Sequence, residues 1–130
     1  MSEVDQLNGR TLAYVGDAVW SLVVREYLVK SGIVNGKVLM DATVSYVSAV
    51  AQAQLYDVLH GEGWFSEAEE AVFHRARNAH SGSVPRSTTV QTYRKATGFE
   101  AIVGMLELNG NGDRIEQILD RAVKLHKEMR

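Results

Sequence analysis

The segment AYVGDAV, residues 13–19, places a carboxylate inside an apolar stretch. Apolar residues recur around Asp17 at helical spacing: they are Val15, Val19, Leu22 and Val23. This pattern predicts a helix with one face in a core. Aspartate is unfavourable inside a helix and resists burial without a partner, and the adjacent Gly16 weakens the helix by a further ~1 kcal/mol relative to alanine. Two local penalties side by side need an explanation.

Composition predicts one soluble globular domain over residues 1–130, since 45% of the residues are hydrophobic and 23% are charged. No apolar run approaches the ~18 residues that span a bilayer. The polar N-terminal segment MSEVDQLNGR has no apolar region typical of a secretory signal. The absence of cysteine excludes disulfides and cysteine-ligated zinc, and it suits a reducing cytoplasm. We therefore expect a cytoplasmic protein without membrane contact.

Hydrophobic spacing predicts an all-α fold, because no alternating strand pattern is found. We expect helices over residues 12–30, 34–43, 45–60, 66–78, 90–108 and 113–128. Ser31-Gly32 is a typical helix end, and Ser66 with Glu69 three residues later forms a capping box. Asp113 is expected to cap the last helix. The strongest loop signal is SGSVPRSTT, residues 81–89, which contains the one proline.

The charges are unevenly distributed along the chain. Residues 71–99 contain no acidic residue. This basic block has five arginine and lysine residues and therefore a charge of +5. The whole chain has a net charge of −2, which leaves −7 for the remainder. A basic block in an acidic protein is a candidate nucleic-acid or anion footprint, although a solvated helix face with a loop would have the same charge.

A second acid, Glu100, lies in the apolar stretch GFEAIVGML, residues 98–106. Small residues flank it on one helical face, as Ala13 and Gly16 flank Asp17, and two such helices crossing would bring the acids together. Paired carboxylates repel unless a cation lies between them, and Mg²⁺ prefers oxygen ligands. The alternative is an ion pair with an arginine, for which Arg25 or Arg94 could serve.

Three stretches together resemble the ribonuclease III family. YVGDAV, residues 14–19, is similar to the core of the family signature, and FEAIVGML, residues 99–106, is similar to its second acidic motif. RARNAHSGSVPRSTTVQTYRKATGFEA, residues 75–101, is similar to the Mini-III branch, which is reduced to the catalytic domain. The resemblance runs in order and with matching spacing from Leu7 to about Leu108.

This resemblance implies a ribonuclease III endonuclease-domain fold, a homodimeric helical bundle, and no double-stranded RNA-binding domain. It implies Mg²⁺-dependent hydrolysis of double-stranded RNA to 5′-phosphate and 3′-hydroxyl products. Asp17 matches the family's catalytic aspartate and Glu100 its metal-binding glutamate. For the Mini-III branch the typical substrate is the precursor of 23S, large-subunit, ribosomal RNA, and a ribosomal protein that presents the RNA is a candidate partner.

The acidic set is thinner than in full-length ribonuclease III. Ala13 occupies the position of a glutamate in that enzyme, and Thr97 occupies the position of an aspartate. Arg10 occupies the position of the acidic residue at which the family's signature helix begins. Mini-III members share this thinner set. Water, RNA phosphate and Thr97 would complete the metal shell, and the number of metal ions is left open. Ser21 departs from the glutamate expected in the Mini-III branch.

The basic block is expected to contact RNA, because duplex RNA is recognised through phosphates and 2′-hydroxyls. The predicted RNA-binding residues are Arg75, Arg77, Asn78, His80, Arg86, Arg94 and Lys95. Arg77 and Arg94 have a structural alternative, in which they fix the loop or pair with a carboxylate.

Two other functions are compatible with an all-α chain that carries these acids. One is a catalytically silent, dimeric RNA-binding module, which would have no reason to retain both Asp17 and Glu100. The other is a different carboxylate enzyme, such as a nucleotide pyrophosphohydrolase, which usually shows clustered Glu-x-x-Glu pairs. The nearest cluster here is Glu67, Glu69 and Glu70, which we expect to form a solvated first helical turn.

Overall fold

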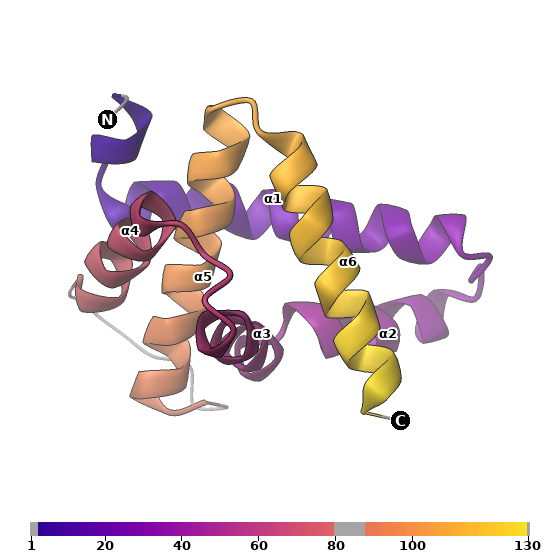
Figure 1. Cartoon of the computed structure of the whole chain (residues 1–130). Helices are drawn as coiled ribbons and strands as arrows, with labels where there is room; N and C mark the ends of the chain where they lie inside the picture. Colours follow the sequence, from indigo (N-terminus) through magenta and orange to yellow (C-terminus); the bar gives the residue numbers. More distant parts are fainter. Residues whose placement is uncertain (1–2, 80–87, 130) are drawn as a thin grey trace.

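A computed structural model describes residues 3–79 and 88–129, and every regular element in these ranges is helical (Figure 1). A short 3₁₀ helix, η1, covers Val4–Gln6. The α-helices are α1 (Gly9–Lys30), α2 (Gly36–Val47), α3 (Ala49–Gly61), α4 (Glu67–Asn78), α5 (Val90–Leu108) and α6 (Gly112–Glu128). The predicted all-α fold is confirmed. Across the described part of the chain, none of the helices combines the length and the apolarity that crossing a membrane requires.

Helices α1 and α5 cross with their backbones in direct contact, which Figure 1 shows as the long α1 passing behind α5. A Cβ on Gly16 would lie 1.7 Å from the backbone oxygen of Glu100, and one on Gly104 would lie 1.9 Å from the backbone oxygen of Leu12. Only glycine fits at either position. The glycine that weakens α1 locally is therefore required by the packing of the two helices.

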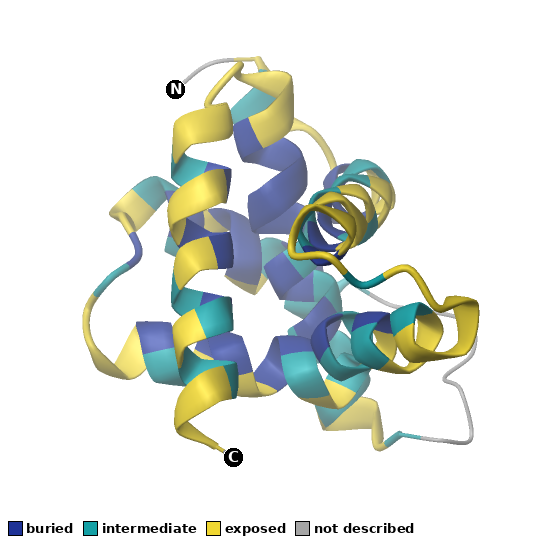
Figure 2. Ribbon diagram, turned by 90° about the vertical axis from the view of Figure 1, so that its right-hand side faces the viewer, coloured by how far each residue is buried: buried dark blue, intermediate teal, exposed yellow. Residues whose placement is uncertain are grey.

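The centre of the core is α5. Residues 101–106 are buried without interruption, and Figure 2 shows the buried residues gathered where the helices face one another. Trp20 of α1 meets Phe99 of α5 edge to face, with ring centroids 5.1 Å apart. The Trp20 indole N–H also donates to the Tyr46 carbonyl at 3.2 Å, which ties α2 to the same core.

The core face of α1 differs from the face that the sequence predicted. The buried side of this helix follows four-residue steps: it comprises Gly9, Leu12, Ala13, Gly16, Trp20, Val24 and Leu28. Val15, Val19 and Val23 are only partly buried, and Leu22 is 56% exposed. Asp17 therefore lies beside the core and is itself exposed.

The helix predicted over residues 45–60 is two helices that meet at Ser48. The Ser48 backbone is extended, with φ −62° and ψ 155°. Its N–H closes α2 on the Val44 carbonyl at 3.0 Å, and its side chain caps α3 by accepting from the Ala51 N–H at 3.2 Å. The hydrophobic pattern continues across this break, so the pattern alone did not predict it.

The capping box at the start of α4 is confirmed, with Ser66 and Glu69 exchanging hydrogen bonds. The prediction of a solvated turn is wrong for Glu69, which is 3% exposed and forms a bidentate pair with Arg114 of α6, with bonds of 2.8 and 2.9 Å. The N-cap of α6 is Asn111 rather than Asp113, which lies in the first turn. The ion pair between the buried Glu69 and the half-buried Arg114 joins α6 to α4.

Candidate active site

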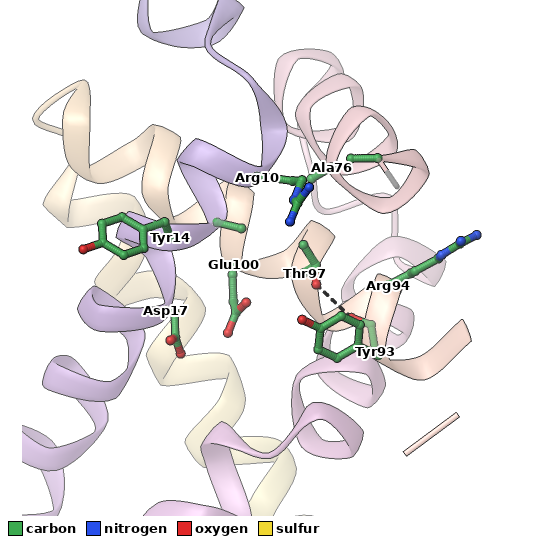
Figure 3. Close-up of a pocket in the computed structure, with 10 residues that line it drawn as sticks. Arg10, Tyr14, Asp17, Ala76, Tyr93, Arg94, Thr97 and Glu100 are labelled. Atoms are coloured by element: carbon green, nitrogen blue, oxygen red, sulfur yellow. Dashed lines mark hydrogen bonds between the residues drawn. The ribbon is translucent and has the colours of Figure 1, made fainter. Parts of the chain in front are cut away.

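Asp17 and Glu100 line one pocket between α1 and α5, and their carboxyl groups lie next to each other (Figure 3). The other lining residues are Arg10, Ala13, Tyr14, Ala76, Ala79, Tyr93, Arg94 and Thr97. The predicted meeting of the two acids is confirmed. The pocket combines two carboxylates with arginines and tyrosines, a set suited to a cation and a phosphate.

The proximity of the two acids follows from the backbone contact between α1 and α5. Gly16 precedes Asp17, and the closest backbone atom to a Cβ at Gly16 is the carbonyl oxygen of Glu100 itself. The two acids are therefore fixed by the main chains of the two helices and not by a loop. Such placement on rigid elements holds functional groups more precisely than loops do.

The environment of Glu100 favours the protonated form. Burial, followed by repulsion from Asp17 and a hydrogen bond with Asp17, raises the pKa of Glu100 from 4.5 to about 8. A hydrogen bond from the Gln52 side chain acts in the opposite direction and lowers the pKa. A strongly perturbed carboxyl in a pocket is characteristic of functional sites.

Arg25 and Arg94, the two arginines that the sequence suggested as ion-pair partners for these acids, line different pockets. Arg25 lines a groove between α1 and α2, together with Val29 and Met40, and does not line the carboxylate pocket. Arg94 does line that pocket. Its side chain extends away from the carboxyls of Asp17 and Glu100 (Figure 3), so neither arginine pairs with the two acids in this structure.

The donor set of the pocket suits a hard cation held by few protein ligands. Within residues 3–79 and 88–129, no group of three or more His, Cys, Asp or Glu side chains is gathered for a metal. Mg²⁺ commonly binds through one or two carboxylates and completes its shell with water and substrate phosphate. The Thr97 hydroxyl lies in the pocket and donates to the Tyr93 carbonyl at 3.0 Å, which leaves its oxygen able to accept.

Four of the predicted RNA-binding residues gather in a second pocket beside the first. This pocket is lined by Arg77, Asn78, Gln91, Arg94 and Lys95. Arg94 lines both pockets and connects them. Lys95 pairs with Asp57 at 2.9 Å, and Arg77 lies 5.7 Å from the centre of the Phe73 ring.

Of the other three predicted RNA-binding residues, the structure describes Arg75, which does not line this pocket. The Arg75 guanidinium donates to the backbone carbonyls of Asp5 and Leu7, the latter at 2.8 Å, and so ties the N-terminal segment to α4. This is a structural role in the RNA-free protein. His80 and Arg86, with most of the predicted loop at 81–89, lie outside the described residues.

Sequence reasoning did not assign Tyr93, Tyr14 or Gln52 to the site. Tyr93 is one turn before Thr97 on the pocket side of α5, a position that helical spacing could have indicated. Tyr14 is 82% exposed at the pocket rim. Gln52 had no signal beyond being a polar residue in an apolar helix.

Residues 10–111 match the family described as the ribonuclease III domain. The chain is 40% identical to the Mini-ribonuclease 3 of Enterococcus faecalis, over 95% of this chain and 94% of that protein. It is 37% identical to the Mini-ribonuclease 3 of Staphylococcus aureus, over 98% and 95% of the two chains. A crystal structure of protein FN1578 from Fusobacterium nucleatum superposes with a TM-score of 0.85 at 30% identity, covering 95% of this chain and 99% of that one. The matched family region includes both Asp17 and Glu100.

Proposed function

The chain belongs to the ribonuclease III family, as its motifs predicted, and we propose that it uses Asp17, Glu100 and Mg²⁺ to cleave double-stranded RNA. The natural substrate we propose is a precursor of 23S ribosomal RNA, in the cytoplasm that a cysteine-free sequence suits. The proposal of this substrate rests on the resemblance to Mini-III ribonucleases. A ribosomal protein that presents the RNA is part of the same proposal.

The observation that carries the proposal is the pairing of two carboxyls in one pocket with the pKa of Glu100 raised to about 8. Asp17 repels the ionised form of Glu100, and a divalent cation between the two would relieve that repulsion. When bound, Mg²⁺ lowers the pKa of a coordinated water and stabilises the charge that develops on a phosphate. Asp17 and Glu100 would hold the ion.

The second pocket supports the binding of the RNA backbone. Arg77, Arg94 and Lys95 bring three positive charges to one side of the carboxylates, and Asn78 and Gln91 add amide groups. Duplex RNA is recognised mainly through phosphates and 2′-hydroxyls, which such groups can contact. We propose that Arg94, Arg77 and Lys95 contact phosphates that neighbour the one to be cleaved.

An exposed apolar face supports the proposed homodimer. Tyr14, Leu22 and Val29 are exposed along one side of α1, and Met40 and Val44 are exposed on the adjoining α2. Contiguous apolar surface of this kind is typical of protein interfaces. Tyr14 also lines the carboxylate pocket, so a second copy on this face would place the two sites close together. A twofold dimer would then match the pseudo-twofold symmetry of duplex RNA.

The test is cleavage of a structured RNA duplex at low salt, with Mg²⁺ or with EDTA, by the wild type and by Asp17→Asn. The matched control is Asp120→Asn, the same substitution at an exposed aspartate on α6. We expect cleavage that requires Mg²⁺, survives in Asp120→Asn and falls roughly 100-fold or more in Asp17→Asn, since metal catalysis contributes several kcal/mol. Duplex binding, measured in EDTA, should be retained in all three proteins.

Two outcomes would contradict this function. Tight binding of several duplexes, including precursor ribosomal RNA stems, without cleavage by any of the proteins would identify a silent RNA-binding module. Cleavage that is unaffected by Asp17→Asn or by EDTA would exclude the two-carboxylate metal site.

A further inference from the structure

Gln52 is a buried glutamine in the first turns of α3, and it is only 2% exposed. Its buried neighbours along this helix are Ala53, Leu55, Tyr56 and Leu59. A primary amide is costly to bury unless its polar atoms are hydrogen-bonded. The position of these bonds therefore indicates what the side chain does.

The Gln52 amide connects the end of α2 to the carboxylate pocket. Its Nε2 donates to the Val47 carbonyl at 3.0 Å, and the same side chain forms a hydrogen bond with Glu100. An amide nitrogen carries two N–H donors, so one can be anchored on Val47 while the other reaches the carboxylate. The anchor fixes the direction of the second donor.

The Oε1 atom of Gln52 is buried and has no hydrogen-bond partner among the groups that the structure describes. A buried acceptor without a donor destabilises the fold, and an apolar side chain of similar shape avoids that cost. A glutamine that only filled space here would be a poor choice. The carboxylate of Glu100 gives the amide a use that packing does not.

We propose that Gln52 is a positioning residue that holds the Glu100 carboxylate in the orientation that binds a divalent cation. This inference rests on the proposed function of Asp17 and Glu100 as cation ligands. Residues that hydrogen-bond a metal-ligating carboxylate orient it, and their loss typically weakens metal binding roughly 10- to 100-fold. Gln52 needs no contact with the ion or the RNA to have this effect.

The test compares Mn²⁺ binding to the RNA-free wild type, Gln52→Leu and Gln54→Leu. Mn²⁺ is a paramagnetic ion that takes oxygen ligands as Mg²⁺ does, so its binding can be followed by electron paramagnetic resonance. Gln54 is exposed two residues further along α3, and it provides the same substitution away from the site. Gln52→Met, which keeps an unbranched side chain, is the second variant if Gln52→Leu does not fold.

We expect the Kd for Mn²⁺ to rise roughly 10- to 100-fold in Gln52→Leu and to stay unchanged in Gln54→Leu. Two effects on the Tm of metal-free Gln52→Leu oppose each other, because the substitution removes both the unpaired acceptor and the bond to the Val47 carbonyl, so ion affinity is the deciding measurement. Duplex binding in EDTA should not change. A purely structural glutamine would instead lower the Tm without this loss of ion affinity.

Other results would overturn the inference, each at a different level. Wild-type Mn²⁺ binding that is equal in Gln52→Leu would exclude the positioning role and leave Asp17 and Glu100 as ligands. A wild type that binds no Mn²⁺ would contradict the cation site itself, and the inference with it.

Discussion

The carboxyl of Glu100 lies in surroundings that disfavour its charge when no cation is present. Burial is the largest cause, Asp17 adds repulsion, and only the Gln52 amide favours the ionised form. With its pKa raised to about 8, Glu100 is mainly protonated at neutral pH. A cation that binds the carboxylate must therefore displace a proton, which makes cation affinity rise with pH up to about this value.

This pKa predicts how the stability of the metal-free protein varies with pH. The folded state holds the Glu100 proton more tightly than the unfolded state, whose glutamates titrate near their ordinary 4.5. The stabilisation is therefore full below about pH 4, declines as the pH rises towards about 8, and is absent above it. We expect the free energy of unfolding in urea to decline over this range more steeply in the wild type than in Glu100→Gln.

Saturating Mg²⁺ should flatten the difference between these two proteins, because the ionised carboxylate is then favoured in the folded state. Equal pH slopes for the wild type and Glu100→Gln without metal would show that the pKa of Glu100 is not raised.

At the scale of the elements, the crossing of α1 and α5 determines where the acids lie. Gly16 and Gly104 let the two backbones meet, and the side chains of Trp20 and Phe99 pack beside the contact. Asp17 directly follows Gly16 on α1, and the backbone of Glu100 on α5 lies against Gly16. A change that separates the helices would both weaken the core and move the two carboxyls apart.

Gly16→Ala is expected to destabilise the protein by about 2 kcal/mol or more, since overpacking commonly costs about 1–3 kcal/mol and the added Cβ would meet backbone. The control is Gly36→Ala at the start of α2, where a Cβ would meet nothing within 4 Å. That variant should be as stable as the wild type or slightly more stable. Thermal unfolding followed by circular dichroism would distinguish the two, and equal Tm values would contradict the close crossing.

The sequence predicted most elements of this fold but not all of their ends. The bounds of α5 agree with the prediction, because Thr89 and Asn109 are clear boundaries of one long apolar pattern. The break at Ser48 was missed because neither glycine nor proline marks it. Asp113 was predicted as the cap of α6, but Asn111 holds that position; both residue types are suitable there, and only the backbone conformation decides between them.

The candidate site was predictable where the residues were conspicuous. Asp17 and Glu100 were found because a charge in an apolar helix has a local cost. Gln52 was missed because nothing in its neighbourhood distinguishes a buried glutamine from an exposed one such as Gln54. Its hydrogen bonds to Val47 and Glu100 exist only in the folded chain.

At the scale of the whole molecule, the exposed apolar face of α1 and α2 is separate from the core. Leu22 and Val44 are each more than half exposed, and so is Met40 at 71%. The groove lined by Val29, Met40 and Val44 lies on this face. A folded chain with this much apolar side-chain surface on two adjoining helices is suited to self-association.

We expect sedimentation to show a dimer for the wild type and a monomer for Leu22→Glu at the same concentration. A buried unpaired carboxylate in the interface should weaken association by roughly 100-fold or more. Leu108→Glu, which changes an exposed leucine at the end of α5, should leave the dimer intact. A Leu22→Glu protein that still sediments as a dimer would place the interface elsewhere.

The main-chain contact between Gly16 and Gly104 also bears on how this site can persist through evolutionary change. The separation of the two acids is determined by backbone atoms, so it does not depend on which apolar side chains fill the rest of the core. Isosteric exchanges in the core usually cost little stability and can accumulate if total volume is kept. Lineages could therefore replace much of the interior and still inherit the same spacing between Asp17 and Glu100, provided that both glycines remain.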